Sequence, residues 1–229
     1  MSRPLQAIVF DFDGVIANSE PLHLLAFQQA LAEDGVELSA ADYYARYLGY
    51  DDVGMFEALG RDRRLPMEDG RVAELVARKG DRMQDLLRSG SVLFPGALEF
   101  IREAASVVPI AIASGAMRHE IDEIIDAAGV SNLFATIVAA GDTPESKPSP
   151  APYRLAFQQL RERTGRELDP RRSVAIEDSK WGLESARGAG LRLVGVTSSY
   201  AADELSGAEL VVNGLDALTL PALDELCAS

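Results

Sequence analysis

The chain has 229 residues, of which 47% are hydrophobic and 25% are charged, enough to bury the core of a large domain with or without a smaller one. Its formal net charge of −14 argues against nucleic acid or an anionic membrane as the main partner, because both select basic surfaces. The single cysteine, Cys227, allows no disulfide framework, and the apolar stretch at residues 4–9 is too short for a signal or membrane segment, so we expect a soluble cytoplasmic protein.

The first predicted element is a buried strand over residues 7–10, which are apolar and partly β-branched. Asp11 and Asp13 follow it, and Gly14 comes directly after them. Because side chains two positions apart in a strand point the same way, we expect the two carboxylates together, where their like charges need neutralising. A divalent cation would do this, since such ions bind carboxylate and carbonyl oxygens. Taken alone, however, an Asp-x-Asp pattern more often marks a solvated turn.

A helical segment comes next, because no clear strand pattern occurs between about Asn18 and Ser91. Apolar residues at helical spacing predict helices over residues 20–33, 39–47, 51–59 and 67–87, with Ser39 as a cap. A loop is expected over residues 48–50. We therefore divide the chain into residues 1–17 and 92–229, and an all-helical insertion over residues 18–91.

Strands and helices alternate in the rest of the chain. Helices are predicted over residues 97–105, 117–128, 150–163 and 181–189, and strands over residues 107–113, 136–140, 173–176, 191–196 and 209–212. This alternation predicts an α/β fold with a parallel sheet and right-handed crossovers.

Chemically useful side chains follow three of these later strands. Ser114-Gly115 stands between a strand and a helix, where a hydroxyl and backbone N–H groups can bind an anion, although Ser114 as a simple helix N-cap is an equal alternative. Lys147 lies in a proline-rich loop that can hold it near a phosphate or a crowded carboxylate; a surface lysine is the alternative.

The third strand is followed by Glu177 and Asp178, which either cap the next helix or join Asp11 and Asp13 at one edge of the sheet. A subset of these four carboxylates would suffice for Mg²⁺, which prefers oxygen ligands and keeps several waters. The sequence therefore predicts a magnesium site at this edge.

Together these motifs resemble, in order, the four motifs of the haloacid dehalogenase-like hydrolase superfamily. They are Asp11-Phe12-Asp13-Gly14-Val15, the strand ending at Ser114, Lys147 in Lys-Pro-Ser-Pro, and Glu177-Asp178-Ser179. The segments 18–23 and 181–186 resemble the subgroup that contains β-phosphoglucomutase and the phosphoglycolate phosphatase-like enzymes. The resemblance implies a Rossmann-like three-layer catalytic core with a parallel sheet, and an inserted all-helical cap domain.

The same resemblance implies a role for each motif residue. Asp11 would be the nucleophile that forms an aspartyl-phosphate, and Asp13 the general acid and then the general base. Mg²⁺ would be held by Asp11, by the backbone carbonyl of Asp13, by Asp178, and by Glu177 directly or through water. Ser114, Gly115 and Lys147 would bind the transferring phosphoryl group.

The resemblance thus implies a Mg²⁺-dependent phosphatase acting on a small phosphorylated metabolite, such as a sugar or organic-acid phosphate. A phosphosugar mutase and a non-catalytic phosphometabolite-binding module are the alternatives. Asp13 argues against a true dehalogenase. The oligomeric state is open, with a monomer slightly favoured.

Several departures and accessory residues concern the cap. The loop over residues 48–52 lacks the arginine with which the mutase holds the distal phosphate, which argues against a mutase, and Asn18 would tune the cap hinge. We expect the cap face and the loop around Gly49 and Tyr50 to set specificity, and His23 and Trp181 to have packing or capping roles. Candidates to replace the missing arginine are Arg46, Arg61, Arg63 and Lys79.

Overall fold

The computed structural model describes residues 3–47, 50, 52–67, 69–89 and 92–228. The chain divides into two compact units, one made of Met1–Asn18 and Leu93–Ser229 and the other of Ser19–Val92. None of the helices in these described ranges combines the length and apolar character needed to cross a membrane.

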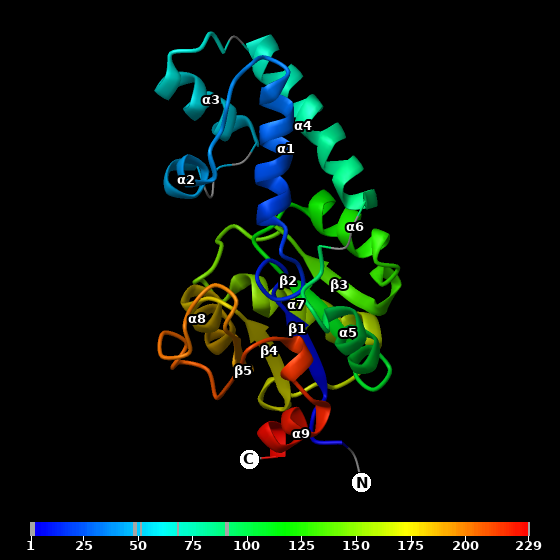
Figure 1. Cartoon of the computed structure of the whole chain (residues 1–229). Helices are drawn as coiled ribbons and strands as arrows, with labels where there is room; N and C mark the ends of the chain where they lie inside the picture. The colour runs from blue at the N-terminus through cyan, green and yellow to red at the C-terminus, as the bar shows by residue number, and fades with distance from the viewer. Residues whose placement is uncertain (1–2, 48–49, 51, 68, 90–91, 229) are drawn as a thin grey trace. The chain divides into compact units, whose positions relative to one another are not determined.

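The first unit is built on a parallel sheet, which among the described residues has six strands in the order β3-β2-β1-β4-β5-β6. Strand β1 therefore lies between β2 and β4, in the middle of the sheet (Figure 1). The strands are β1 (Ala7–Phe10), β2 (Ile110–Ala113), β3 (Phe134–Val138), β4 (Ser173–Glu177), β5 (Arg192–Val196) and β6 (Leu210–Val212).

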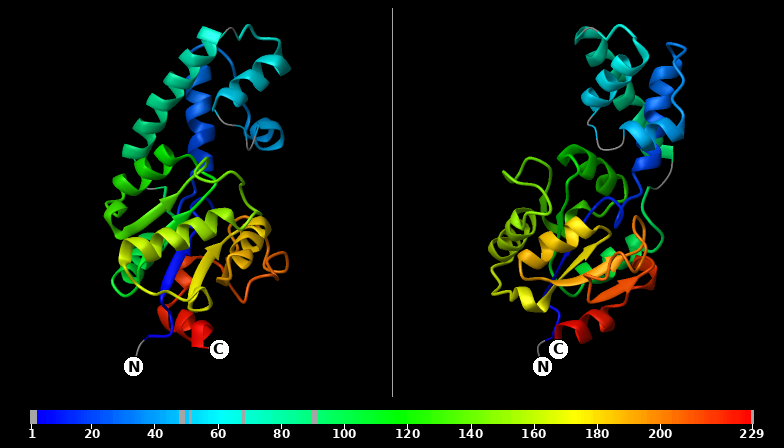
Figure 2. Two further views of the ribbon diagram at one scale, coloured as in Figure 1. Left: turned by 180° about the vertical axis from the view of Figure 1, so that it is seen from behind. Right: turned by 90° about the vertical axis from the view of Figure 1, so that its left-hand side faces the viewer.

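Helices cover both faces of this sheet, which explains why its central strands are apolar on both sides. On one face, Val9 and Ala175 pack in a core with Tyr153 of α7 (Ala151–Thr164) and Leu183 of α8 (Lys180–Gly188). On the other face, the ring of Phe10 meets Phe100 of α5 (Ala97–Ala105), with ring centroids 6.2 Å apart. Figure 2 shows the sheet between these layers. The unit also contains helices α6 (Arg118–Ala127) and α9 (Leu220–Ala228), with short 3-10 turns η2 (Ser131–Leu133), η3 (Pro170–Arg172) and η4 (Leu215–Ala217).

This arrangement confirms the predicted α/β, Rossmann-like fold, but some element boundaries were wrong. Strand β2 begins at Ile110, not at Val107, because the N–H groups of Val107 and Val108 donate to the carbonyl of Ala104 and close α5. Strand β3 is Phe134–Val138, two residues earlier than predicted. Helix α9 was not predicted, although Leu220, Leu223 and Cys227 form a buried stripe at helical spacing.

The regular elements of the second unit are helices and helical turns throughout the part that the structure describes. It contains α1 (Glu20–Ala32), α2 (Ala40–Asp42), a π-helical turn η1 (Tyr43–Tyr47), α3 (Asp52–Arg63) and α4 (Asp69–Ser89). Ser39 caps α2 as predicted, since its side chain accepts the N–H of Asp42. Phe27, Phe56 and Leu75 belong to a separate apolar core.

The segments that flank the helical insertion are paired with each other. Ala17 and Leu93 form an isolated antiparallel bridge, and the N–H of Phe94 donates to the carbonyl of Ile16 at 3.0 Å. The chain therefore leaves the sheet unit and returns to it at neighbouring points.

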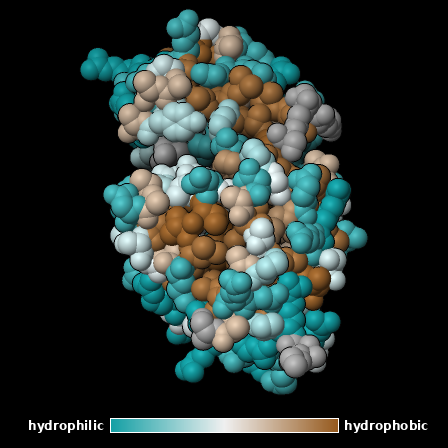
Figure 3. Space-filling view, turned by 60° about the horizontal axis from the view of Figure 1, so that its bottom comes forward, coloured by the Kyte–Doolittle hydropathy of each residue, from teal (hydrophilic) through white to brown (hydrophobic). Residues whose placement is uncertain are grey.

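Large apolar side chains are also exposed. Figure 3 shows hydrophobic side chains reaching the surface among hydrophilic ones. Trp181 is 58% exposed, so the expectation that it packs at the start of its helix was wrong. Among the described residues, the other exposed large apolar ones are Leu25, Tyr44, Tyr50, Val53, Val107 and Met117.

Candidate active site

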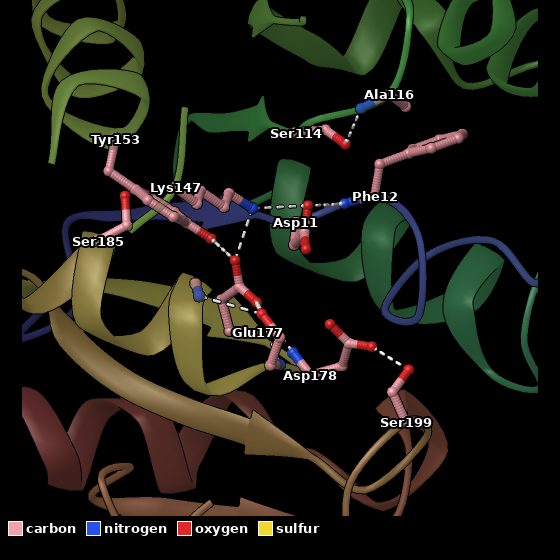
Figure 4. A network of polar contacts seen from close by, with 12 residues as sticks. Asp11, Phe12, Ser114, Ala116, Lys147, Tyr153, Glu177, Asp178, Ser185 and Ser199 are labelled. Carbon is pink, nitrogen blue, oxygen red and sulfur yellow. Dashed lines mark hydrogen bonds and ion pairs between the residues drawn. The ribbon is translucent and has the colours of Figure 1, made fainter. Parts of the chain in front are cut away.

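The polar residues that follow β1, β2 and β4 gather at the carboxyl edge of the sheet. Asp11 follows β1 directly, Ser114 follows β2, and Glu177 is the last residue of β4. Parallel strands end at the same edge, which is where α/β proteins bind ligands. Figure 4 shows the side chains of Asp11, Lys147, Glu177 and Asp178 pointing toward one another.

Three buried carboxylates form the centre of this site. Asp11, Glu177 and Asp178 each offer an oxygen, and these oxygens all lie within 4.8 Å of one another. Lys147 contacts two of them: its Nζ lies 2.8 Å from Asp11 Oδ1 and 2.6 Å from Glu177 Oε1. Its side chain is only 13% exposed, so the alternative of an ordinary surface lysine was wrong.

Asp13 does not belong to this carboxylate cluster. Its side chain is exposed, whereas Asp11 is buried, and the expectation that both carboxylates point the same way stays a prediction. Strand β1 ends at Phe10, and the chain turns through Gly14, whose φ is +79°, so the alternation of a strand does not extend to Asp13. A Cβ at Gly14 would lie 1.9 Å from Asp178 Oδ2, so both the turn and the cluster require glycine.

Glu177 holds the cluster together through hydrogen bonds. Its Oε1 accepts from Lys147 Nζ at 2.6 Å and from the Tyr153 hydroxyl at 2.8 Å. Its Oε2 accepts the N–H groups of Asp178 and Ser179 and the Ser179 hydroxyl. The N-cap of α8 is Ser179, which accepts the N–H of Gly182, so a capping role for Glu177 was the wrong alternative.

The pKa shifts follow from this crowding. Burial, and then the charge of Glu177, raise the pKa of Asp11 well above its usual range, while Lys147 opposes them. Burial also raises the pKa of Asp178 to about 6, against a hydrogen bond from Ser199 that lowers it. For Lys147, burial lowers the pKa, but Asp11 and Glu177 outweigh burial and keep that pKa above its usual value.

The donor set fits a divalent cation. If ionised, the three buried carboxylates carry three negative charges against the single positive charge of Lys147, which leaves two to be neutralised. Hard divalent cations prefer carboxylate oxygens, and their charge matches this excess. Asp11, Glu177 and Asp178 could therefore hold one.

Ser114 and Gly115 lie at the end of β2. Ser114 is buried, and its hydroxyl accepts the N–H of Ala116 at 3.0 Å. Met117 is the N-cap of α6, so the alternative that Ser114 caps this helix was wrong. Gly115 is exposed, and a Cβ there would meet nothing within 4 Å, so the backbone is open to a ligand on that side.

Three contacts at the site were missed in the sequence. Tyr153 reaches Glu177 from α7, and no strand-end pattern pointed to it. Ser199, which bonds Asp178, and Ser198, which donates to the carbonyl of Gly14, lie just after β5. The rule that singled out Ser114, a hydroxyl following a strand, could have found this pair.

The four cationic side chains considered as replacements for the missing arginine each have an acidic partner within the helical unit. Lys79 is buried, with Nζ 2.8 Å from Asp52 Oδ1 and 3.1 Å from His23 Nδ1. The three arginines considered for the same role also have acidic partners. Of the loop expected to set specificity, Gly49 lies outside the described residues. Arg46 pairs with Asp62, Arg63 with Asp42, and Arg61 with Glu57.

Comparison with known proteins agrees with this fold and site. Residues 8–196 match the model of the haloacid dehalogenase-like hydrolase family. Protein CbbY of Rhodobacter capsulatus is 34% identical over 97% of the chain and 99% of its own length. The chain therefore belongs to the haloacid dehalogenase-like hydrolase family, as its motifs predicted.

Two further relatives bear on the subgroup. Phosphoglycolate phosphatase of Pectobacterium atrosepticum is 27% identical, covering 91% of this chain and 88% of that protein. A crystal structure of a CbbY variant from Rhodobacter sphaeroides, in complex with xylulose-1,5-bisphosphate, has a TM-score of 0.76 and 29% identity, covering 96% and 99% of the two chains. These relatives agree with the predicted phosphoglycolate phosphatase-like subgroup.

Proposed function

We propose that the protein is a Mg²⁺-dependent phosphatase that hydrolyses a small phosphorylated sugar or organic acid through an aspartyl-phosphate. The observation that carries this proposal is the buried cluster of Asp11, Glu177 and Asp178 with Lys147 bound inside it. Such a cluster is costly to bury without a function, because like charges repel and each loses its hydration.

Asp11 is the proposed nucleophile. Its Oδ1 accepts from the N–H of Phe12 at 2.7 Å and from Lys147 Nζ, so the carboxylate is held in one orientation. Attack on phosphorus forms the bond to Asp11 and breaks the bond to the leaving oxygen, and water then cleaves the acyl phosphate. A residue with access to solvent suits the proton transfers in both steps, and the exposed Asp13 is proposed for them.

Phosphate binding is assigned to Ser114, Gly115 and Lys147. The Lys147 ammonium offsets the repulsion between an anionic nucleophile and an anionic phosphate. Mg²⁺, held by Asp11, Glu177, Asp178 and the backbone carbonyl of Asp13, would neutralise further charge on the phosphoryl oxygens. The helical unit is the proposed cap, and a monomeric, cytoplasmic protein stays our prediction.

The test is a screen of phosphate esters with purified protein and Mg²⁺. It includes xylulose-1,5-bisphosphate and phosphoglycolate, chosen from the named relatives, and a chromogenic ester. We expect phosphate release that is abolished by Asp11→Asn and retained in Asp126→Asn, an exposed aspartate on α6. No release from any ester would refute the proposal, and isomerisation of a phosphosugar faster than phosphate release would indicate a mutase.

A further inference from the structure

Tyr153 is a buried tyrosine whose hydroxyl is not needed for packing. Its ring lies in the apolar core between the sheet and α7 and α8, and the residue is 0% exposed. Phenylalanine would fill that space equally well and would spare the desolvation of a hydroxyl. The hydroxyl instead donates to Glu177 Oε1 at 2.8 Å.

The same tyrosine also contacts the lysine of the site. Lys147 Nζ lies 5.0 Å from the centroid of the Tyr153 ring, a distance at which an ammonium is attracted to an aromatic face. Lys147 and the Tyr153 hydroxyl share the acceptor Glu177 Oε1. Tyr153 therefore contacts both members of the Lys147–Glu177 pair: its ring contacts the lysine and its hydroxyl contacts the glutamate.

Because Lys147 and Tyr153 share Glu177 Oε1, the tyrosine influences the directions in which the Lys147 ammonium can donate hydrogen bonds. An ammonium has three N–H groups, and two directions are already taken by Asp11 Oδ1 and Glu177 Oε1. Because the phenol donates to Oε1, that oxygen is partly neutralised and the carboxylate is fixed in rotation. The ammonium can then keep its bond to Asp11 and direct its remaining N–H at a bound anion.

We propose that Tyr153 is a positioning residue of the phosphate site, which acts through Glu177 to orient Lys147 toward Asp11 and the phosphoryl group. The proposal rests on the proposed function for its kinetic part. Its binding part concerns inorganic phosphate alone and can be tested without turnover.

The experiment compares the wild type with Tyr153→Phe, which removes only the hydroxyl. Calorimetry with Mg²⁺ present should show phosphate binding about tenfold weaker in the variant, and kcat on the best ester about tenfold lower. Mg²⁺ binding without phosphate should change less than twofold. The matched control is Thr136→Val, which removes another buried hydroxyl that contacts α7, at Gln159, and should leave phosphate binding and kcat unchanged.

A double-mutant cycle tests whether the effect passes through Glu177. In a Glu177→Gln background, Tyr153→Phe should change phosphate binding by less than twofold. The proposal is overturned if Tyr153→Phe binds phosphate within twofold of wild type, if its effect is equally large in both backgrounds, or if the variant does not fold, because the hydroxyl would then be structural. If Tyr153→Phe weakens phosphate binding as expected but the wild type hydrolyses no ester, only the proposed function is refuted.

Discussion

Replacing Gly182 by alanine should damage both stability and the active site. Gly182 lies in the first turn of α8, where an added Cβ would be 1.8 Å from Glu177 Cδ and 1.9 and 2.0 Å from its two carboxylate oxygens. No real Cβ contact is this short, so either the Glu177 carboxylate must move or α8 must shift. Leu183 and Ala186 of α8 are buried against the sheet, so movement of the carboxylate is the expected response.

The expected loss is large because Glu177 is charged, fully buried and bonded through both oxygens. Separating a buried charge from its partner costs about 3–5 kcal/mol. We therefore expect Gly182→Ala to lower the free energy of unfolding by about 3–5 kcal/mol, a considerable part of the ~5–15 kcal/mol typical of a folded domain. Activity should fall as well, since Lys147 loses its second carboxylate partner.

Urea unfolding, followed by circular dichroism, measures this loss. The matched control is Gly80→Ala, also inside a helix, where a Cβ meets nothing within 4 Å and where alanine should stabilise by up to about 1 kcal/mol. In a Glu177→Ala background, Gly182→Ala should cost less than about 1 kcal/mol, because the clash is gone. Equal stability of Gly182→Ala and wild type would refute the reasoning, as would an unchanged cost in the Glu177→Ala background.

Three other outcomes are expected. Ser199→Ala removes the hydrogen bond to Asp178 and should weaken Mg²⁺ binding about tenfold by calorimetry; unchanged affinity would mean that Ser199 does not orient the ligand. Because burial raises the pKa of Asp178 to about 6, its contribution to stability without metal is present at low pH and lost as the pH rises through 6, so thermal melts should show Mg²⁺ stabilising the protein at pH 7.5 and hardly at pH 5. Burial raises the pKa of the Cys227 thiol to about 11, so at pH 8 iodoacetamide should modify the native protein about a hundredfold more slowly than the unfolded chain.

The strand-end residues of the site could be predicted because parallel strands bring distant positions to one edge. Asp11, Glu177 and Asp178 needed only the positions of two strands to be placed together. This argument does not extend to Asp13, because β1 ends at Phe10 and the backbone turns through Gly14.

Contacts made from helices could not be predicted in the same way. Tyr153 occupies an apolar helical position, and its spacing gives no sign that its hydroxyl reaches Glu177 across the core. The start of β2 was misplaced for a similar reason: Val107 and Val108 have strand-forming side chains, but their N–H groups close the preceding helix. The role of the Tyr153 hydroxyl and the start of β2 both depend on hydrogen bonds that the pattern of apolar residues does not encode.

The pairing of Ala17 with Leu93 bears on the order in which the chain can fold during synthesis. Strand β1 has no sheet neighbour until residues 110–112 of β2 and 173–176 of β4 have been made, whereas the inserted unit is continuous in sequence and its core needs no later residue. During synthesis, β1 therefore stays without its sheet partners while the residues of the helical unit are being made. The bridge between Ala17 and Leu93 brings the two ends of the helical insertion together, so the insertion is equivalent to one long loop of the sheet unit. The length and sequence of the insertion can therefore vary without changing the register of β1 against its neighbours.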